Sequence, residues 1–251
     1  SGDNIGITGI EKTYERAIRG LRGIKYHNVD AQGINMGSFE NGAYDTLSQP
    51  GLNLVLTIDG ALQKYAERLM DGKTGSLVAI DPSSGEILAL VSAPSYDPSL
   101  FSGRAFSQNF ATIQRDSLKP LFNRPLQAMY PPGSMFKTIQ ALIALEQDQV
   151  RADEIITVNG QLIGDHAPPG RYDMERAITK SSNNYFFKVF RRVIQQGEDP
   201  SPFIDSRIGY SKWRDYVLQF GFGKMLDIDL PNEKAGFVPS LESYDKIYGK
   251  D

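Results

Sequence analysis

The sequence lacks several residue types, and each absence excludes a class of chemistry. Its 251 residues include no cysteine, which rules out disulfides, thiolate nucleophiles and cysteine-based zinc sites. The only histidines are His27 and His166, so a histidine-rich metal centre is excluded, and a Ser-His-Asp triad would have to use one of these two. No stretch approaches the ~20 consecutive apolar residues of a membrane span.

Charge and composition exclude further classes of protein. The 27 Lys and Arg are offset by 30 Asp and Glu, a net charge of −3, so the chain lacks the basic surface expected of a nucleic-acid-binding domain. Hydrophobic residues make up 40% and charged residues 23%, which is typical of a globular protein. The length predicts one large domain, or one domain with a small appendage.

The first half of the chain gives both weak and strong structural signals. Apolar residues at helical spacing predict a short amphipathic helix over residues 10–23, followed by irregular or hairpin structure over 24–50. An apolar, β-branched run predicts a strand over 52–58, after which Asp59 is predicted to cap a helix. The clearest hairpin pairs residues 76–81 with residues 86–92.

The second half is predicted to be mainly helical. Residues 93–132 show little periodicity and are expected to shape a functional surface. A helix that opens at Ser134 is apolar on nearly every side and is therefore expected to be buried. Asp173 is predicted to cap a helix that pauses at residues 180–183 and resumes to Gly197, and a last helix is predicted over 211–220. The chain is therefore expected to combine a helical subdomain with a sheet.

The strongest candidate for chemistry is the pair Ser134 and Lys137. Three residues is close to one helical turn, so the Lys137 ammonium can lie beside the Ser134 hydroxyl on one helix face. A hydroxyl needs a base to become a nucleophile, and a desolvated lysine with a lowered pKa can serve as that base. The alternative is that Ser134 caps the helix and Lys137 extends to solvent. A charge in so apolar a helix favours the catalytic interpretation.

A second candidate is Ser181-Ser182-Asn183, between two helical segments. A serine and an asparagine two positions apart, C-terminal to an S-x-x-K sequence, match the motif order of serine penicillin-recognising enzymes. Taken alone, these residues are more typical of a helix break with an asparagine cap. Asp165 and His166 adjoin in a loop, but no cysteine and no second nearby histidine complete a metal set, so hydrogen bonding is favoured. No metal or cofactor site is predicted.

Motifs along nearly the whole chain carry a family resemblance. They are Asn123-Arg124-Pro125, the run from Tyr130 to Lys137, residues 56–59, 78–82 and 85–89, Phe220-Gly221-Phe222-Gly223, and Asp229-Leu230-Pro231-Asn232-Glu233. In this order they resemble the class B penicillin-binding proteins, and most of all their elongation-type penicillin-binding protein 2 branch. Residues 9–20 resemble the end of that family's N-terminal pedestal.

This resemblance implies an α+β fold of the penicillin-binding and β-lactamase type, a serine transpeptidase fold with a helical subdomain beside an antiparallel sheet. Residues 1–51 would be a remnant of the N-terminal pedestal or linker, and residues 52–251 the transpeptidase domain. The resemblance also implies four roles: Ser134 as nucleophile, Lys137 as general base, Ser181 as proton relay, and Asn183 as the residue that holds the substrate amide.

Two family features are expected to lie outside this sequence. The family's K-T-G motif belongs to a strand that follows Asn183. Lys73-Thr74-Gly75 precedes Ser134 and leads into the first hairpin, so it does not qualify. The motif and the last strands are expected beyond Asp251, and the membrane anchor and most of the pedestal before Ser1. We therefore expect this sequence to be part of a longer protein.

The function implied by the resemblance is peptidoglycan D,D-transpeptidation during cell elongation, through an acyl-enzyme formed on serine with D-Ala-D-Ala stem peptides. The expected partners are the stem peptides, β-lactam antibiotics and a membrane glycosyltransferase, and no nucleic acid. The expected location is the bacterial inner membrane, with the catalytic domain in the periplasm. Two alternatives stay open: a class D-like β-lactamase, and a non-catalytic β-lactam sensor or binding domain.

Overall fold

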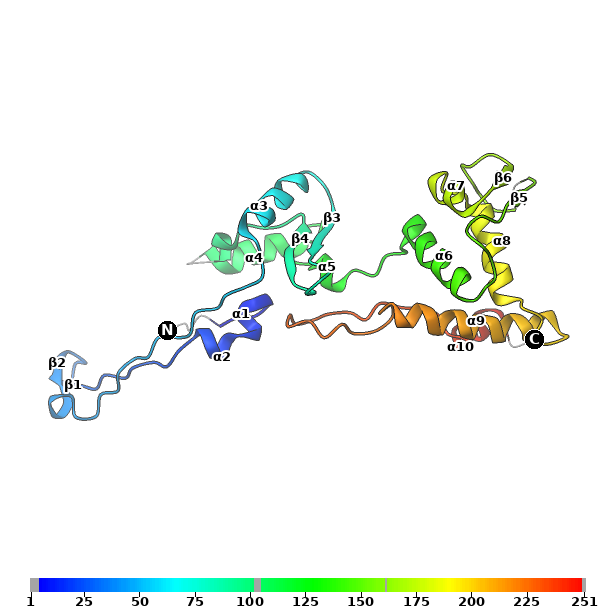
Figure 1. The fold of residues 1–251 in the computed structure, drawn as a ribbon. Coiled ribbons are helices and arrows are strands. Elements are labelled where there is room, and N and C mark those ends of the chain that lie inside the picture. The colour runs from blue at the N-terminus through cyan, green and yellow to red at the C-terminus, as the bar shows by residue number, and fades with distance from the viewer. Residues whose placement is uncertain (1–4, 102–104, 161, 250–251) are drawn as a thin grey trace. The chain divides into compact units, whose positions relative to one another are not determined.

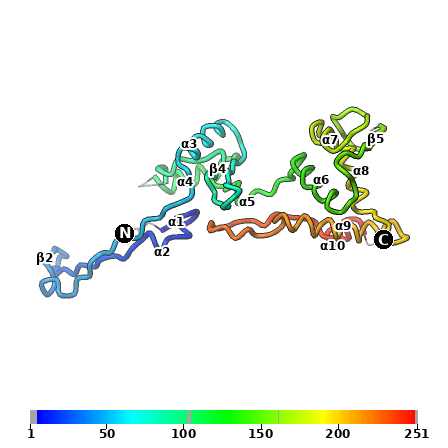
Figure 2. The backbone as a smooth tube through the Cα atoms, viewed as in Figure 1, coloured from blue at the N-terminus to red at the C-terminus, as the bar shows by residue number. Residues whose placement is uncertain are grey.

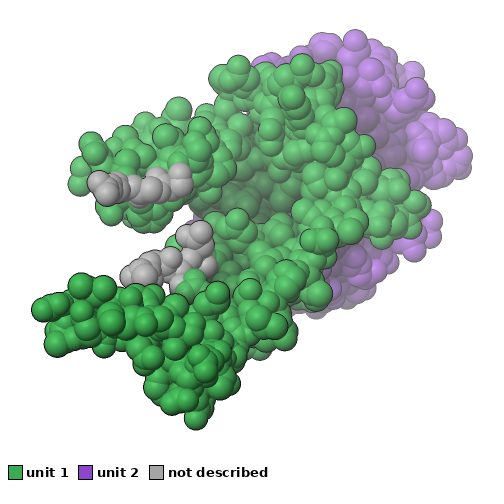
Figure 3. Space-filling view, turned by 90° about the vertical axis from the view of Figure 1, so that its left-hand side faces the viewer, with its two compact units in different colours: residues 1–128, 227–233 green, residues 129–226, 234–251 purple. Residues whose placement is uncertain are grey.

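A computed structural model describes residues 5–101, 105–160 and 162–249 (Figure 1). The chain divides into two compact units, each discontinuous in sequence (Figure 3). Unit 1 comprises residues 1–128 and 227–233, and unit 2 comprises residues 129–226 and 234–251. No described helix is both long enough and apolar enough to cross a membrane.

The first helical region of unit 1 is broken where a single helix was predicted. α1 (Gly9–Thr13) and α2 (Glu15–Ile18) are separated because Tyr14 leaves the helical conformation, with φ −103° and ψ 14°. The Tyr14 hydroxyl donates a hydrogen bond to Asp229, 2.5 Å away in the 227–233 segment. Tyr14 therefore interrupts the predicted helix, and its side chain bonds to a residue 215 positions away.

Residues 24–50 contain the predicted hairpin. β1 (His27–Val29) and β2 (Asn35–Ser38) pair antiparallel, and the 3₁₀ turn η1 (Phe39–Gly42) follows. The two chain segments that lead to this hairpin run side by side (Figure 2), with Leu21 bridged to Gln49 and Ile24 bridged to Thr46.

The strand predicted over residues 52–58 does not form, which corrects that expectation. These residues are extended but join no ladder, and Val55 is 96% exposed. Two hydrogen bonds near the end of this run link it to β4 (Ile87–Ala93), from Thr57 Oγ1 to the Ile87 carbonyl and from the Asp59 N–H to the Leu88 carbonyl. The apolar side chains of this run line a cavity of about 660 Å³ in unit 1 instead of a sheet face.

The helix and hairpin predicted after Asp59 are confirmed. The Asp59 carboxylate accepts hydrogen bonds from the N–H groups of Ala61 and Leu62 at the start of α3 (Gly60–Leu69). β3 (Gly75–Ile80) pairs antiparallel with β4 (Ile87–Ala93). α3 packs on β4, and the small core between them contains Ala66, Ala89 and Val91.

The long segment after β4 holds more structure than its weak periodicity indicates. It contains η2 (Pro98–Phe101), α4 (Phe106–Arg115) and α5 (Arg124–Gln127). The rings of Phe106 and Phe110 stack on α4 with centroids 6.0 Å apart. The side chain of Arg124 is buried and donates to the backbone carbonyl of Leu118, 2.5 Å away.

Unit 2 is built around a larger core. α8 (Asn183–Ile194) buries one face, because Tyr185, Phe186, Val189 and Val193 recur at helical spacing. This face packs against α6 (Phe136–Glu146) and against α9 (Pro202–Gln219). The hairpin of β5 (Ile156–Val158) and β6 (Gly170–Tyr172), followed by α7 (Met174–Thr179), completes the core.

α6 is buried on one face only, which corrects the expectation of a helix buried all round. Gln140, Ala141, Ile143 and Ala144 are buried, whereas Leu142 is 52% exposed. The buried Gln140 accepts a hydrogen bond from the Trp213 indole at 2.9 Å. Among the described residues the core therefore meets one stripe of α6 and leaves the opposite stripe open.

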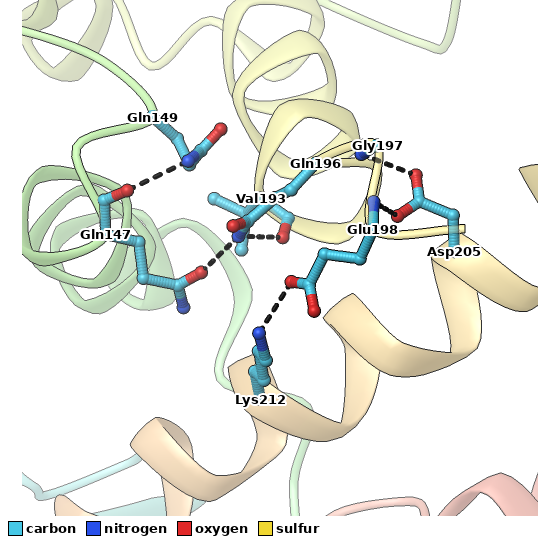
Figure 4. Close-up of polar contacts among 8 residues, drawn as sticks. All are labelled: Gln147, Gln149, Val193, Gln196, Gly197, Glu198, Asp205 and Lys212. Carbon is cyan, nitrogen blue, oxygen red and sulfur yellow. Dashed lines mark hydrogen bonds and ion pairs between the residues drawn. The ribbon is translucent and has the colours of Figure 1, made fainter. Parts of the chain in front are cut away.

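The last helices are longer and more numerous than predicted. α9 begins nine residues before the expected start at 211, because Ser201 caps it and Pro202 occupies its first turn. α10 (Leu241–Tyr248) was not predicted, although Ser240 and Ser243 form a capping box there. The buried Asp205 in the first turn of α9 accepts from the N–H groups of Gly197 and Glu198 in the turn between α8 and α9 (Figure 4).

Candidate active site

Ser134 lies in a turn that leads into α6. The turn, η4 (Gly133–Met135), follows two prolines, and Gly133 adopts φ +59°, a conformation that favours glycine. Ser134 is exposed, and the residue at the N-cap of α6 is Met135. The capping role considered for Ser134 is therefore not the one it has, and its hydroxyl is accessible.

Lys137 lies in the first turn of α6 and is partly buried. Its ammonium donates to the Ser181 carbonyl at 2.6 Å and to the Ser181 hydroxyl at 2.9 Å. Burial lowers the pKa of Lys137 below the ordinary lysine value, while the negative charge of Asp165 opposes that shift. A lowered pKa increases the neutral fraction of the amine, which is the form that a general base requires.

Ser181 stands between the other two side chains. Its hydroxyl donates to the Ser134 hydroxyl at 3.0 Å while it accepts from Lys137. The three groups thus form one hydrogen-bonded series, in which Lys137 reaches Ser134 through Ser181. The sequence predicted that Lys137 and Ser134 would be close, and the family resemblance implied a proton-relay role for Ser181, the residue that bonds to both of them.

The backbone at Ser181 explains how this hydroxyl is positioned. The N–H of Ser181 bonds the Ile178 carbonyl, and the N–H of Ser182 bonds the Ala177 carbonyl, which is the Schellman arrangement at the end of α7. Ser181 occupies the left-handed position of that motif with φ +52°, where glycine is usual. A serine there stores backbone strain, as residues at functional sites often do.

Asn183 begins α8, directly after its N-cap Ser182. Its amide Nδ2 donates to the Gly164 carbonyl at 2.7 Å. This bond orients the side chain and leaves the acceptor Oδ1 for an external N–H donor. All four predicted residues therefore belong to unit 2, and three of them join directly through side-chain hydrogen bonds.

Two residues that the sequence did not single out for the site lie directly behind this turn. The Asp165 carboxylate accepts from the Ser182 hydroxyl at 3.0 Å and from the Asn184 N–H at 2.8 Å. Asn184 is 2% exposed. The loop at residue 165 was expected to hydrogen-bond, but Ser182 and Asn184 are 17 and 19 residues away from Asp165, and no local spacing rule predicts these two partners.

A metal cluster and the K-T-G tripeptide are the other features considered. The described residues contain no cluster of three or more histidine or acidic side chains that could hold a metal. The K-T-G tripeptide at residues 73–75 lies in unit 1 at the start of β3, where Lys73 donates to the Leu69 carbonyl.

Comparisons with known proteins identify the family. The family model for the penicillin-binding protein transpeptidase domain matches residues 75–249, and the model for the penicillin-binding protein dimerisation domain matches residues 1–56. The first match covers more than half of the chain and includes all four predicted site residues. The chain belongs to the penicillin-binding protein transpeptidase family, and its fold is the α+β fold of that family.

Curated relatives narrow the similarity within this family. The chain is 32% identical to the peptidoglycan D,D-transpeptidase MrdA of Acinetobacter baumannii over 95% of its own length. It is 30% identical to MrdA of Escherichia coli strain K12 over 98% of its length. It spans only 34% and 38% of these two relatives, about a third of their length.

Solved structures of penicillin-binding protein 2 are also similar to this chain. Penicillin-binding protein 2 of Pseudomonas aeruginosa in complex with WCK 5153 matches 97% of the chain with a TM-score of 0.70 and 30% identity. Penicillin-binding protein 2 of Helicobacter pylori matches 98% with a TM-score of 0.75 and 28% identity. The chain covers 49% and 45% of these two structures.

Proposed function

We propose that the protein is a peptidoglycan D,D-transpeptidase of the elongation type, with Ser134 as the nucleophile. The observation that carries this proposal is the series of hydrogen bonds from Lys137 through Ser181 to Ser134, in a chain of the penicillin-binding protein transpeptidase family. Similarity to curated D,D-transpeptidases and to penicillin-binding protein 2 structures supports the same activity.

The acylation step follows from these contacts. Ser134 Oγ attacks the carbonyl carbon between the two D-Ala residues of a stem peptide. Its proton passes to Ser181 Oγ as Ser181 gives its own proton to neutral Lys137, so the hydrogen bonds between these groups reverse direction. When the C–N bond breaks, the same series returns the proton to the amine of the departing D-Ala. Asn183 Oδ1 accepts the N–H of the bound peptide.

The second step regenerates the serine. An amine of a neighbouring peptidoglycan strand attacks the ester carbonyl on Ser134, the bond from that carbon to Ser134 Oγ breaks as the amide cross-link forms, and a proton from the amine passes to Ser134 Oγ to restore the hydroxyl. A β-lactam acylates Ser134 in the same way, since its ring amide mimics the D-Ala-D-Ala bond.

The domain roles and the setting of the activity belong to the same proposal. Residues 1–51 form the end of a pedestal and residues 52–251 belong to the transpeptidase domain. The full-length protein is anchored in the inner membrane, holds this domain in the periplasm and works with a membrane glycosyltransferase. The match of residues 1–56 to the dimerisation-domain model supports the pedestal assignment. A Helicobacter pylori penicillin-binding protein 2 has been solved in complex with MreC, and a corresponding protein partner is part of this proposal by analogy.

The test is direct identification of the acylated residue in the full-length protein. After reaction with penicillin, peptide mapping by mass spectrometry is expected to place the adduct on Ser134, and Ser134→Ala is expected to remove it. Incubation with a stem pentapeptide is expected to release D-Ala. An adduct on another serine, or one that persists in Ser134→Ala, would overturn the proposal. Rapid, repeated nitrocefin hydrolysis would favour a β-lactamase, and acylation without D-Ala release would favour a sensor.

A further inference from the structure

Asp165 is one carboxylate connected to several parts of the catalytic turn. Its Oδ2 accepts from the Ser182 hydroxyl, the Asn184 N–H and the Asn184 Nδ2, at 3.0, 2.8 and 3.0 Å. Its Oδ1 accepts from the N–H of Ala167 at 3.0 Å. Ser182 and Asn184 flank Asn183, and Ser182 follows Ser181, so this acid contacts the turn on both sides of the substrate-facing asparagine.

Asn184 extends the connection to the rest of the loop. Its Oδ1 accepts from the N–H groups of Leu162 and Ile163, and its Nδ2 also donates to the Ile163 carbonyl at 3.1 Å. Both donors and both acceptor positions of this buried amide are therefore occupied. Ser182 is equally satisfied, since its hydroxyl donates to Asp165 and accepts from the Tyr185 N–H. A buried polar network with every member paired fixes a single arrangement.

We propose that Asp165 is a positioning residue for acylation of Ser134, a role that rests on the function proposed above. Its carboxylate holds the Ser181–Asn183 turn in place through Ser182 and Asn184, and its negative charge acts on the Lys137 ammonium. Asp165 contacts no substrate in this role and acts through the groups that do.

Among the residues that the structure describes, Asp165 is the acid whose charge acts on Lys137. On α7 and α8 the charged side chains either bond elsewhere or are exposed: Glu175, Arg176, Lys180, Lys188, Arg191 and Arg192. On α9 they bond to α10, to the loops on either side of the helix or to solvent: Asp205, Arg207, Lys212, Arg214 and Asp215.

The sign of the electrostatic effect follows from the two influences on Lys137. Burial lowers its pKa and the charge of Asp165 raises it, so loss of that charge lowers the pKa further. Acylation requires neutral Lys137, so its rate rises with pH through the pKa of this residue. Neutralising Asp165 should therefore move the acid limb of the pH profile to lower pH.

The experiment compares Asp165→Asn with Asp153→Asn in the full-length protein. Asp153 belongs to the same unit and is exposed in an ion pair with Arg151, so the control removes the same charge away from the site. The readout is the second-order rate of acylation by a fluorescent penicillin across the pH range. For Asp165→Asn we expect the plateau rate to fall about tenfold to a hundredfold, the scale of small misplacements in an active site. The acid limb should shift down by roughly half a pH unit.

A second variant separates position from charge. Ser182→Ala removes one hydrogen bond to Asp165 and keeps the carboxylate, so it should lower the plateau rate and leave the acid limb unmoved. It also serves if Asp165→Asn folds poorly, because an unchanged rate in Ser182→Ala would then overturn the proposal.

The outcomes distinguish this proposal from the one on which it rests. If the wild-type protein is not acylated on Ser134, the proposed function fails. If the wild type is acylated and Asp165→Asn retains its rate, or loses rate with the acid limb unmoved, then only the positioning role of Asp165 is overturned. A shifted acid limb in Asp153→Asn would also overturn it.

Discussion

The two units differ in the size of their hydrophobic cores. Among the described residues, the core cluster of unit 2 contains fourteen buried side chains, whereas the cluster between α3 and the β3–β4 hairpin of unit 1 contains three. Unit 1 also has an irregular run whose Val55 is 96% exposed beside an apolar cavity of about 660 Å³, while cavities described in unit 2 are smaller, at about 390 and 460 Å³. The groups that we place in the reaction all lie in the unit with the larger core.

The difference in core size is consistent with placing the catalytic residues in unit 2. A catalytic series of hydrogen bonds works only if its members stay within a few tenths of an ångström of their positions, and a dense core supplies that rigidity. Apolar surface that stays accessible is the kind on which other segments or other proteins pack. The contrast predicts that substitutions in unit 2 change chemistry and stability together, while matched substitutions in unit 1 change neither as much.

The largest effect is expected at Lys137. Lys137→Met keeps most of the side-chain volume but removes the base, so acylation by penicillin should fall by ~10²-fold or more. Lys73→Met, which alters the K-T-G tripeptide of unit 1, should leave the rate unchanged. Stopped-flow acylation of both variants provides the comparison. Equal rates for Lys137→Met and wild type would reduce Lys137 to a packing residue.

The next effect compares the cores. Val189 is 0% exposed in α8 and Val91 is 4% exposed in β4. Val189→Ala leaves a hole inside a closely packed cluster and should cost about 2 kcal/mol of unfolding free energy. Val91→Ala should cost about 1 kcal/mol, because the thin layer around it can collapse into the space. Urea denaturation of both variants measures the difference, and equal costs would contradict the contrast between the units.

A smaller effect concerns two helix ends inside unit 2. Asp148 lies two residues after the end of α6 and Ser181 two residues after the end of α7, and both adopt the same left-handed conformation with φ of +52°. Replacing either residue by glycine relieves backbone strain and should stabilise the protein by about 1 kcal/mol. Ser181→Gly should also lower acylation at least about tenfold, since the relay hydroxyl is lost, whereas Asp148→Gly should keep full activity.

Thermal unfolding and acylation rates of these two glycine variants separate strain from chemistry. If Ser181→Gly retained the wild-type rate, the proton relay proposed for this hydroxyl would be wrong. If neither variant gained stability, the left-handed conformation at these helix ends would carry no strain.

The smallest effect is expected in acid. Burial alone would raise the pKa of Asp165, but the N–H groups of Asn184, Ala167 and Asn183 outweigh it and hold that pKa well below the usual range. A lowered folded-state pKa contributes stability above the unfolded value of about 3.9, and this stability is lost as pH falls through the folded value. Asp165→Asn should therefore show a flatter fall in stability on acidification. Urea midpoints measured at decreasing pH test this, and parallel curves would contradict it.

The sequence predicted the parts of this protein that depend on local chemistry. Asp59 and Asp173 were correctly assigned as helix caps, and the hairpin across residues 82–85 formed as expected, because a cap and a tight turn are decided within a few residues. An S-x-x-K sequence followed by an S-x-N sequence indicates that Ser134, Lys137 and Ser181 share one site, and their side chains are joined by hydrogen bonds in the structure.

What the sequence did not predict depends on contacts between distant residues. The run over 52–58 has the composition of a strand, yet no neighbouring strand in the described chain takes it up. Leu142 is about as hydrophobic as the buried Ile143 beside it, and only the placement of α8 and α9 decides which stripe of α6 is covered. Asp165 and Asn184 meet because a loop folds back onto a helix start, which no spacing rule describes.

The hydrogen bond from Tyr14 to Asp229 has a consequence for the synthesis of the chain. The two residues are 215 positions apart, and unit 1 is completed by a segment that follows most of unit 2. At 5–20 residues per second, Tyr14 leaves the ribosome roughly 10–40 s before its partner exists. During that time the apolar residues that line the unit 1 cavity lack Ile228 and Leu230 beside them. The nascent chain therefore exposes this apolar surface until Ile228 and Leu230 have been synthesised. Chaperones bind to exposed apolar surface of this kind.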